Sequence, residues 1–237
     1  MEWRCNGVAL QKFASVLLRP EASKASDAVL ANVRAAAARH GRVFFLMYDL
    51  SRMPVDKLSL VAADWRRLIA DRLTRSPGYL SHKGRPVLGL WGLGFVGRDL
   101  SPAQTEELLT QLRATSADAG GVTILGGVPA YWREGKGDAS PDPAWKAIWP
   151  KIDVISPWTG GRYADDAGAD NYRVHTLEPD LAAAKALGVD YMPVAFPGFS
   201  WANLKRARHE SAKAIFNQIP RRCGAFYWRQ IANAVHA

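Results

Sequence analysis

Residues 121–138 read GVTILGGVPAYWREGKGD. The first half is apolar, and its Val, Thr and Ile are β-branched residues that favour a buried strand. The second half holds a glycine pair, a proline, the adjacent aromatics Tyr131 and Trp132, and the charged Arg133 and Glu134. A buried strand that opens into aromatic and charged side chains is typical of a functional site at the strand's C-terminal end.

The same order of residue types recurs along the chain. Each time an apolar run ends in Tyr, Trp or Phe, accompanied by Gly, Pro or a carboxylate. The further runs are RVFFLMYDLS at 42–51, RPVLGLWGLGF at 85–95, DVISPWTGGRY at 153–163 and DYMPVAFPGFSW at 190–201. Together with GVALQKF at 7–13, they predict strands that are buried on both faces.

Helical patterns separate these strands. Apolar side chains recur at helical spacing, and Ser101 with Gln104 forms a capping box with proline at the first helical position. The expected helices are Ser23–His40, Asp56–Leu73, one from Ser101, one from Asp142 to Pro150, Asp170–Leu187 interrupted at Pro179 and closed by Gly188, and Gly224–Ala237. Strands that alternate with helices predict a parallel sheet with helical crossovers.

The fold class predicted from this alternation is a (β/α)8 barrel. A doubly wound sheet has the same alternation but concentrates its functional residues at one switch point, whereas here nearly every strand ends in them. About six units are recognisable where a complete barrel has eight. We therefore expect residues 1–237 to form a single incomplete barrel domain that lacks an N-terminal unit and the final βα unit.

Composition excludes several classes of protein. The chain has 237 residues and a net charge of +9, but its Lys and Arg are spread out and no nucleic-acid-binding motif occurs, so no nucleic-acid partner is expected. No apolar segment approaches the ~20 residues of a membrane span, and no signal peptide opens the chain. Cys5 and Cys223 lie far apart and are expected to be free thiols, with one disulfide as the alternative. The five His are scattered, so neither a metal nor a cofactor is expected.

Five strings of residues resemble a known family. They are MYDLS at 47–51, GGVPAYWRE at 126–134, DVISPWTGGRY at 153–163, YMPVAFPGFSW at 191–201 and NQIPRRCGAFYWRQ at 217–230. In the same order, such strings resemble the endo-α-mannosidase-like glycoside hydrolases of families 71 and 99, and more closely the bacterial family-99-like proteins often labelled xylosidase or arabinosidase. The resemblance covers nearly the whole chain. It implies a (β/α)8 barrel that acts on α-linked oligosaccharide or polysaccharide, in the periplasm or outside the cell.

One feature of that family has no counterpart in this sequence. Its catalytic acids form a carboxylate-x-x-carboxylate motif on the last strand, after the helix that begins here near Phe226. Because no position matches the motif, no catalytic carboxylate can be transferred by resemblance. We expect a truncated glycoside hydrolase-like chain with weak or no activity, and the alternative is a non-catalytic carbohydrate-binding barrel. A nucleotide-binding α/β domain is disfavoured, because no phosphate-binding loop occurs.

Glycoside hydrolysis normally needs two carboxyl groups that flank the bond. Asp49, at the end of an apolar strand, and Glu134, in the loop after residues 121–128, are the candidate catalytic acids. The alternative for Asp49 is a turn cap, and for Glu134 an ion pair with Arg133 or Lys136. Asp138 is expected to start a turn. Asp153 precedes its strand, so it should lie at the opposite, non-catalytic end.

Aromatic residues at strand ends are the candidate sugar contacts, because an indole or phenol ring covers the apolar face of a pyranose and can also donate a hydrogen bond. The candidates are Trp91, Trp132, Trp158 and Trp201 as platforms, Tyr48, Tyr131 and Tyr163 as donors, and Gln11 on the first strand. For each Trp the alternative is a place in the core. Lys205, Arg206, Arg208, His209 and Lys213 form a basic cluster that is expected to be a solvated helix face, with a rim for acidic glycans as the alternative.

Overall fold

A computed structural model of the protein describes residues 7–13, 20–209 and 218–237. The chain divides into two compact units, Met1–Ile155 and Ser156–Ala237.

The first unit is built on parallel strands. These are β1 (Gly7–Phe13), β2 (Val43–Asp49), β4 (Arg85–Trp91) and β5 (Thr123–Val128). They lie side by side in the order β1-β2-β4-β5, and each neighbouring pair is parallel, as the sequence predicts. A two-residue strand that the sequence did not predict, β3 (Ser81–His82), pairs antiparallel with β4. Lys83 and Gly84 join them with φ of 50° and 77°, the left-handed pair that a tight hairpin requires.

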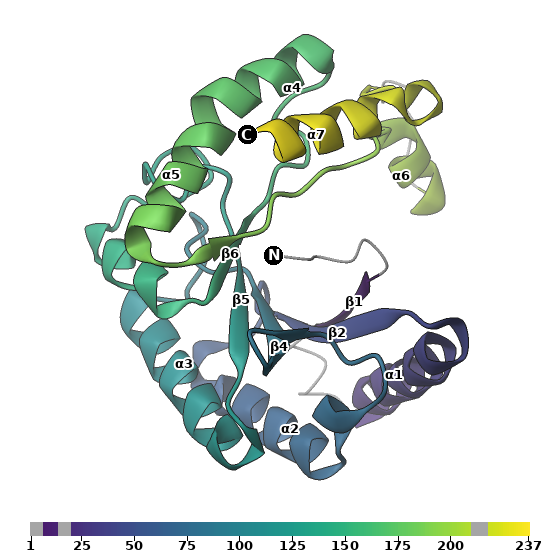
Figure 1. Ribbon diagram of the computed structural model, residues 1–237, viewed down its shortest axis with the longest axis vertical. Helices are drawn as coiled ribbons and strands as arrows, with labels where there is room; N and C mark the ends of the chain where they lie inside the picture. The colour runs from purple at the N-terminus through teal and green to yellow at the C-terminus, as the bar shows by residue number, and fades with distance from the viewer. Residues whose placement is uncertain (1–6, 14–19, 210–217) are drawn as a thin grey trace. The chain divides into compact units, whose positions relative to one another are not determined.

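Helices α1 (Pro20–His40), α2 (Ser59–Ala70) and α3 (Pro102–Ser116) connect these strands and lie together on one side of them (Figure 1). Short 3-10 turns at Val55–Lys57, Leu73–Arg75 and Ala117–Ala119 flank α2 and follow α3. The predicted capping box at Ser101 is confirmed, since its hydroxyl accepts from the Gln104 N–H. The buried Trp65 donates its indole N–H to Ser116 Oγ at 2.9 Å, which fixes α2 against α3.

The prediction of a single regular helix from Asp142 to Pro150 is wrong. The segment forms two 3-10 turns, η5 (Pro143–Ala147) and η6 (Trp149–Lys151). The Asp142 carboxylate does cap the start, accepting from the Ala144 N–H at 2.9 Å. Pro150, however, lacks the N–H that an α-helix needs at this position, and its ring clashes with the carbonyl four residues earlier. The proline therefore limits the segment to short turns.

The last two strands are short. Strand β6 (Val154–Pro157) contains the boundary between the two units, and β7 (Asp190–Tyr191) covers only the first two residues of the run at 190–201. Pro193 and Pro197 explain the short strand, because neither can donate a hydrogen bond to a neighbouring strand.

The helix predicted over residues 170–187 begins earlier and is divided. Asp165 caps α4 (Asp166–Tyr172), a π turn follows at Arg173–Leu177, and α5 (Glu178–Leu187) ends at Gly188, whose φ of 72° confirms the predicted stop. Pro179 lies in the first turn of α5 and cannot donate to the carbonyl four residues earlier. The π turn widens the backbone where that hydrogen bond is missing.

Two further helices complete the second unit, α6 (Trp201–Ala207), which carries the first residues of the basic cluster that is expected to be helical, and α7 (Ala225–His236). Helix α7 lies beside α4 (Figure 1). Their contact surrounds Phe226, which is fully buried with Ala169 and Ile219. Across the contact, the guanidinium of Arg229 makes two hydrogen bonds, of 2.7 and 2.5 Å, to the Asp170 carboxylate.

Candidate functional site

The C-terminal ends of three strands of the first unit are level with one another. Asp49 at the end of β2 pairs in register with Trp91 of β4, which pairs with Gly127 of β5. The Leu50 N–H donates to the Trp91 carbonyl at 2.9 Å, and the Gly92 N–H donates to the Gly127 carbonyl at 3.1 Å. The residues that follow β2, β4 and β5 therefore share one edge of the sheet, as the sequence predicts for parallel strands.

Tyr48 and Asp49 point to opposite faces of the sheet, because successive side chains of a strand alternate. Tyr48 is fully buried and donates its hydroxyl to Asp64 Oδ2 of α2 at 2.6 Å, and burial raises the pKa of this phenol well above its ordinary value. Its side chain belongs to the layer between the sheet and α2, a position that does not support contact with a substrate. Asp49 consequently faces away from α2.

The Asp49 carboxylate is buried, at 6% exposure, and its Oδ1 accepts from the Ser51 N–H at 2.9 Å. This is the turn-capping contact considered for it from the sequence. Arg98 fixes the same turn by donating to the Ser51 carbonyl at 2.8 Å. Arg98 was not predicted as part of this edge, because nothing in the sequence relates residue 98 to residue 51.

Trp91 is half-buried, and its ring lies over Gly127. A Cβ atom on Gly127 would come within 2.2 Å of Trp91 Cε3, so only glycine leaves room for the indole. The ring of Phe95 packs against Trp91 with centroids 5.3 Å apart. The glycine pair of the sequence therefore has a clear role, which is to accommodate an aromatic side chain from the neighbouring strand.

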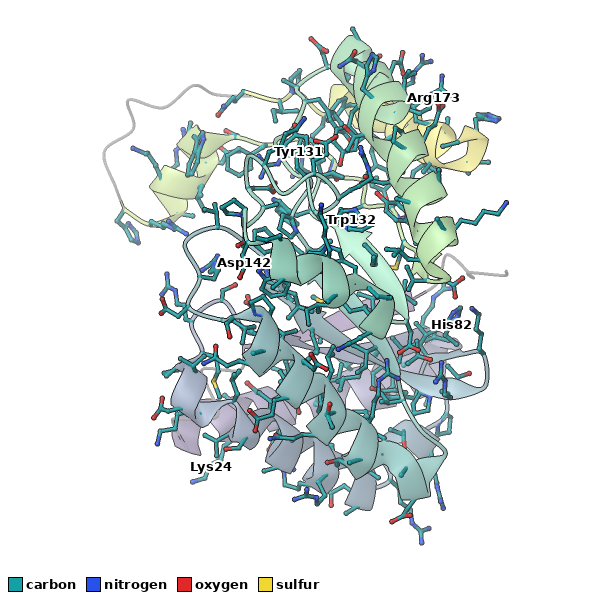
Figure 2. All side chains as sticks on the ribbon, turned by 90° about the vertical axis from the view of Figure 1, so that its left-hand side faces the viewer. Lys24, His82, Tyr131, Trp132, Asp142 and Arg173 are labelled. Carbon is teal, nitrogen blue, oxygen red and sulfur yellow. The ribbon has the colours of Figure 1, made fainter. Side chains whose placement is uncertain are left out.

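Tyr131 and Trp132 follow β5 in one loop (Figure 2) but have different surroundings. Trp132 is only 3% exposed and meets Trp149 edge to face at 5.9 Å, while Trp149 stacks on Trp145 at 5.2 Å. This is the core alternative considered for Trp132. Tyr131 is half-buried, and the Lys136 ammonium lies 5.6 Å from the centre of its ring.

The acids of this loop are engaged by neighbouring groups. Asp138 accepts from the Ala130 N–H at 3.0 Å and the Tyr131 N–H at 3.3 Å, so it holds the loop together rather than starting a turn. Glu134 accepts from Lys136 Nζ at 2.6 Å and Arg133 Nη2 at 2.8 Å. The hydrogen bond from Lys136, aided by Arg133, lowers the pKa of the Glu134 carboxyl. Glu134 is therefore ionised at neutral pH and holds no proton that it could give to a leaving group.

In the second unit, two of the predicted platforms are open to solvent. Trp158, after β6, is 44% exposed, and Trp201, at the start of α6, is 45% exposed. The ring of Phe199 meets Trp201 edge to face at 5.0 Å. The loops after β6 and β7 are joined by a 2.7 Å hydrogen bond from Thr159 Oγ1 to the Val194 carbonyl. The second unit therefore presents exposed aromatic rings on segments that follow its strands.

Tyr163 belongs to the core of the second unit. Its ring packs against those of Tyr172, Phe196 and Phe226 at 5.1 to 6.0 Å. Its hydroxyl donates to Gln230 Oε1 at 3.0 Å, and burial raises the pKa of this phenol to about 12. These contacts do not favour the predicted role as a donor to sugar.

The structure describes only some of the remaining predicted residues. Gln11 lies on β1 in register with Met47 of β2. Lys205 and Arg206 lie in the last turn of α6, and Arg208 and His209 follow it, whereas Lys213 and Cys5 lie outside the described residues. Cys223 is an exposed free thiol.

The contacts of Asp153 agree with the prediction that it lies at the end of the sheet opposite to the candidate site. It accepts from Arg85 at 2.9 Å, from Arg113 at 3.1 Å and from the Ile124 N–H at 2.8 Å. Arg85 is the first residue of β4, and Ile124 lies at the start of β5. Asp153 therefore fastens the N-terminal ends of the strands, opposite to the candidate site.

Residues 7–13, 20–209 and 218–237 contain no group of three or more His, Cys, Asp or Glu side chains that could hold a metal ion. None of the helices in the same ranges has the length and apolar character needed to cross a bilayer.

Parallel strands that alternate with helices, with acidic and aromatic residues where the strands end, define an α/β fold of the barrel type. Two solved structures share it. One is described as a glycoside hydrolase-like protein, with 16% identity, a TM-score of 0.60, and a match over 97% of this chain and 67% of that chain. The other is a GH99 endo-α-mannosidase from Bacteroides thetaiotaomicron in complex with bis-tris propane, with 14% identity, a TM-score of 0.64, and a match over 98% of this chain and 62% of that chain.

These matches establish the fold. The predicted barrel-type fold and the resemblance to endo-α-mannosidase-like proteins are confirmed at that level, and this chain spans about two thirds of the length of the two structures. No protein-family model and no curated protein matches the sequence. The roles of the candidate residues stay predictions.

Proposed function

We propose that this chain is a glycoside hydrolase-like protein that binds α-linked oligosaccharide and hydrolyses it weakly or not at all. The observation that carries the proposal is the shared fold, matched over nearly the whole chain to a glycoside hydrolase-like protein and an endo-α-mannosidase. Aromatic and acidic residues follow the strands of this fold, where proteins of the barrel type place their sites.

Exposed indole rings support the binding part of the proposal. Trp158 and Trp201 each leave nearly half of their surface open, although an indole normally contributes to stability by being buried. An exposed ring on a segment that follows a strand can cover the apolar face of a pyranose. Removal of one such platform should weaken binding of an oligosaccharide about tenfold, which corresponds to about 1.4 kcal/mol.

The state of the acids supports weak hydrolysis. A glycosidase needs one carboxyl group that gives a proton and a second that acts as nucleophile or base. Asp49 is a turn acceptor, Glu134 is paired with two cations, and Asp138 accepts two backbone N–H groups. The pKa of Glu134 is lowered, which is unsuited to proton donation, and the loss of general acid help lowers a rate by roughly 10² to 10⁴.

The test uses purified residues 1–237. Binding of α-linked mannotriose is measured by calorimetry, and hydrolysis of an aryl α-mannoside and of α-mannan is measured in parallel. We expect measurable binding and negligible turnover, with turnover unchanged in Asp49→Asn and Glu134→Gln. Glu107→Gln, on the exposed side of α3, is the matched control.

Two outcomes would change the proposal. Robust turnover that either Asp49→Asn or Glu134→Gln abolishes, while Glu107→Gln retains it, would show that the chain is an active hydrolase. Absence of both binding and turnover across α-linked mannose, glucose and xylose oligosaccharides would remove the assignment to carbohydrate. Binding with no turnover at all would favour the non-catalytic carbohydrate-binding barrel.

A further inference from the structure

The loop after β6 presents Trp158 beside a buried neighbour. Trp158 is 44% exposed, whereas Thr159 is 4% exposed and donates its hydroxyl to the Val194 carbonyl at 2.7 Å. The Arg162 N–H donates to the Thr159 carbonyl at 3.0 Å, which closes the turn that follows. The backbone that carries the exposed indole is therefore anchored on both sides of Thr159.

Gly160 packs directly against the indole of Trp158. A Cβ atom on Gly160 would lie 2.8 Å from Cζ2, 3.0 Å from Cε2 and 3.4 Å from Nε1 of that ring. The nearest of these distances is too short for carbon atoms, so an alanine at position 160 would force the ring to move. The absence of a side chain at Gly160 thus leaves the space in which the indole lies.

Positions 160 and 161 both require glycine, but for different physical reasons. Gly161 has a φ of 80°, which a residue with a side chain adopts only with strain, and no atom lies within 4 Å of its Cβ position. Gly160 does not have a left-handed φ, so its backbone conformation is open to alanine. What requires glycine at position 160 is the room taken by Trp158.

We propose that Trp158 is a preorganised platform for one hexopyranose ring and that Gly160 is its positioning residue. This inference rests on the proposed function, and it names the part of the second unit that contacts the sugar. A ring that is already held in its bound orientation loses little rotamer freedom when the ligand arrives. Displacement of the ring by a methyl group at position 160 should weaken binding about three- to tenfold, in line with the usual cost of immobilising one side chain.

The experiment compares Gly160→Ala, Trp158→Leu, the double variant and the control Ala164→Ser, which changes an exposed neighbour. Binding of α-linked mannotriose is measured by calorimetry, and the folded state is checked by thermal unfolding. The indole N–H resonance of Trp158, identified by its loss in Trp158→Leu, reports the position of the ring without any ligand.

We expect Gly160→Ala to shift the Trp158 indole resonance, to leave the Tm unchanged and to weaken binding three- to tenfold. In the Trp158→Leu background the same change should have no further effect on binding. An unshifted indole resonance in Gly160→Ala, or undiminished binding in Trp158→Leu, would overturn the inference while the proposed function stands. If the unmodified chain fails to bind any α-linked oligosaccharide, the proposed function fails and the platform role falls with it, whereas the resonance still tests how Gly160 positions the ring.

Discussion

Replacement of Gln230 by leucine tests the packing of α7 in the second unit. The buried Gln230 amide accepts from the Tyr163 hydroxyl and the Phe196 N–H, both at 3.0 Å, and donates to the Phe196 carbonyl at 2.8 Å and the Phe226 carbonyl at 2.9 Å. Leucine would leave the Tyr163 hydroxyl and both Phe196 backbone groups without these partners. The Phe226 carbonyl keeps its helical hydrogen bond.

The magnitude follows from these three groups. An orphaned buried polar group costs roughly 1–3 kcal/mol, and the lower value applies because Tyr163 and Phe196 are only half-buried and the Tyr163 hydroxyl keeps a hydrogen bond with Thr159. Gln230→Leu should therefore lower the free energy of unfolding by about 3 kcal/mol, or the Tm by roughly 6–12 °C for a chain of this size. Gln111→Leu, which removes an exposed amide that donates to Glu107, is the control and should have little effect.

Urea unfolding monitored by tryptophan fluorescence gives the free energy, and hydrogen exchange of the Phe196 amide gives the local effect. Gln230→Glu adds a pH signature, because its carboxylate would face two carbonyl oxygens and its folded-state pKa would be raised. The contribution of the neutral carboxyl group to the free energy of unfolding should be fully present below the unfolded-state pKa of about 4.3. It should be lost as pH rises through the raised folded-state pKa. A loss under 1 kcal/mol in Gln230→Leu, with the Phe196 amide still protected, would refute the reasoning.

Two further changes test the two units separately. Gly127→Ala should destabilise the first unit by about 1–3 kcal/mol in thermal or urea unfolding. The added Cβ would also lie 3.2 Å from the Trp91 Cα atom, so movement of the Trp91 side chain alone cannot relieve the clash. An unchanged Tm would contradict this. Asp170→Asn should lower stability by about 1 kcal/mol at neutral pH, because the hydrogen bonds from Arg229 hold the pKa of Asp170 at about 2. A depressed folded-state pKa contributes stability above the ordinary pKa near 4, and this contribution is lost as pH falls through about 2, so the difference in free energy of unfolding between the variant and the unmodified chain should vanish over that range. A difference that persists at pH 2, or that the control Asp118→Asn at an exposed position reproduces, would count against the ion pair.

The strands and their parallel order were predictable because both faces of the sheet are covered. Each strand is then a nearly continuous apolar run, and such runs are visible in the sequence. Several of the errors lie at prolines. Pro150 limits a predicted helix to 3-10 turns, and Pro193 and Pro197 shorten β7. The interruption expected at Pro179 takes the form of a π turn just before it. The sequence shows that a proline disturbs a segment, but the neighbouring structure decides how the backbone accommodates it.

The candidate site was predictable only as a set of positions after strands. Trp132 and Trp158 each follow the end of a strand, yet one is buried and the other is exposed. What separates them is that Trp149 packs against Trp132 from a later segment of the chain. In the same way, the alternation of side chains along a strand predicts that Tyr48 and Asp49 face opposite sides of the sheet. Only the hydrogen bond from Tyr48 to Asp64 shows that Tyr48 is the residue that faces α2.

The π turn at Arg173–Leu177 fixes the length of the chain between α4 and α5. A π turn holds one residue more than the α-helical turn that it replaces, so deletion of one residue there would convert it to regular α-helix and keep the orientation of α5. An α-helix advances about 100° per residue, so insertion of a further residue would instead rotate the side chains of α5 by about 100° relative to those of α4. Asp180, which is 1% exposed and accepts from the Tyr191 hydroxyl at 3.3 Å, would then turn out of the interior. A single deletion in this segment is consequently tolerated, whereas an insertion requires α5 to change its pattern of buried residues at the same time.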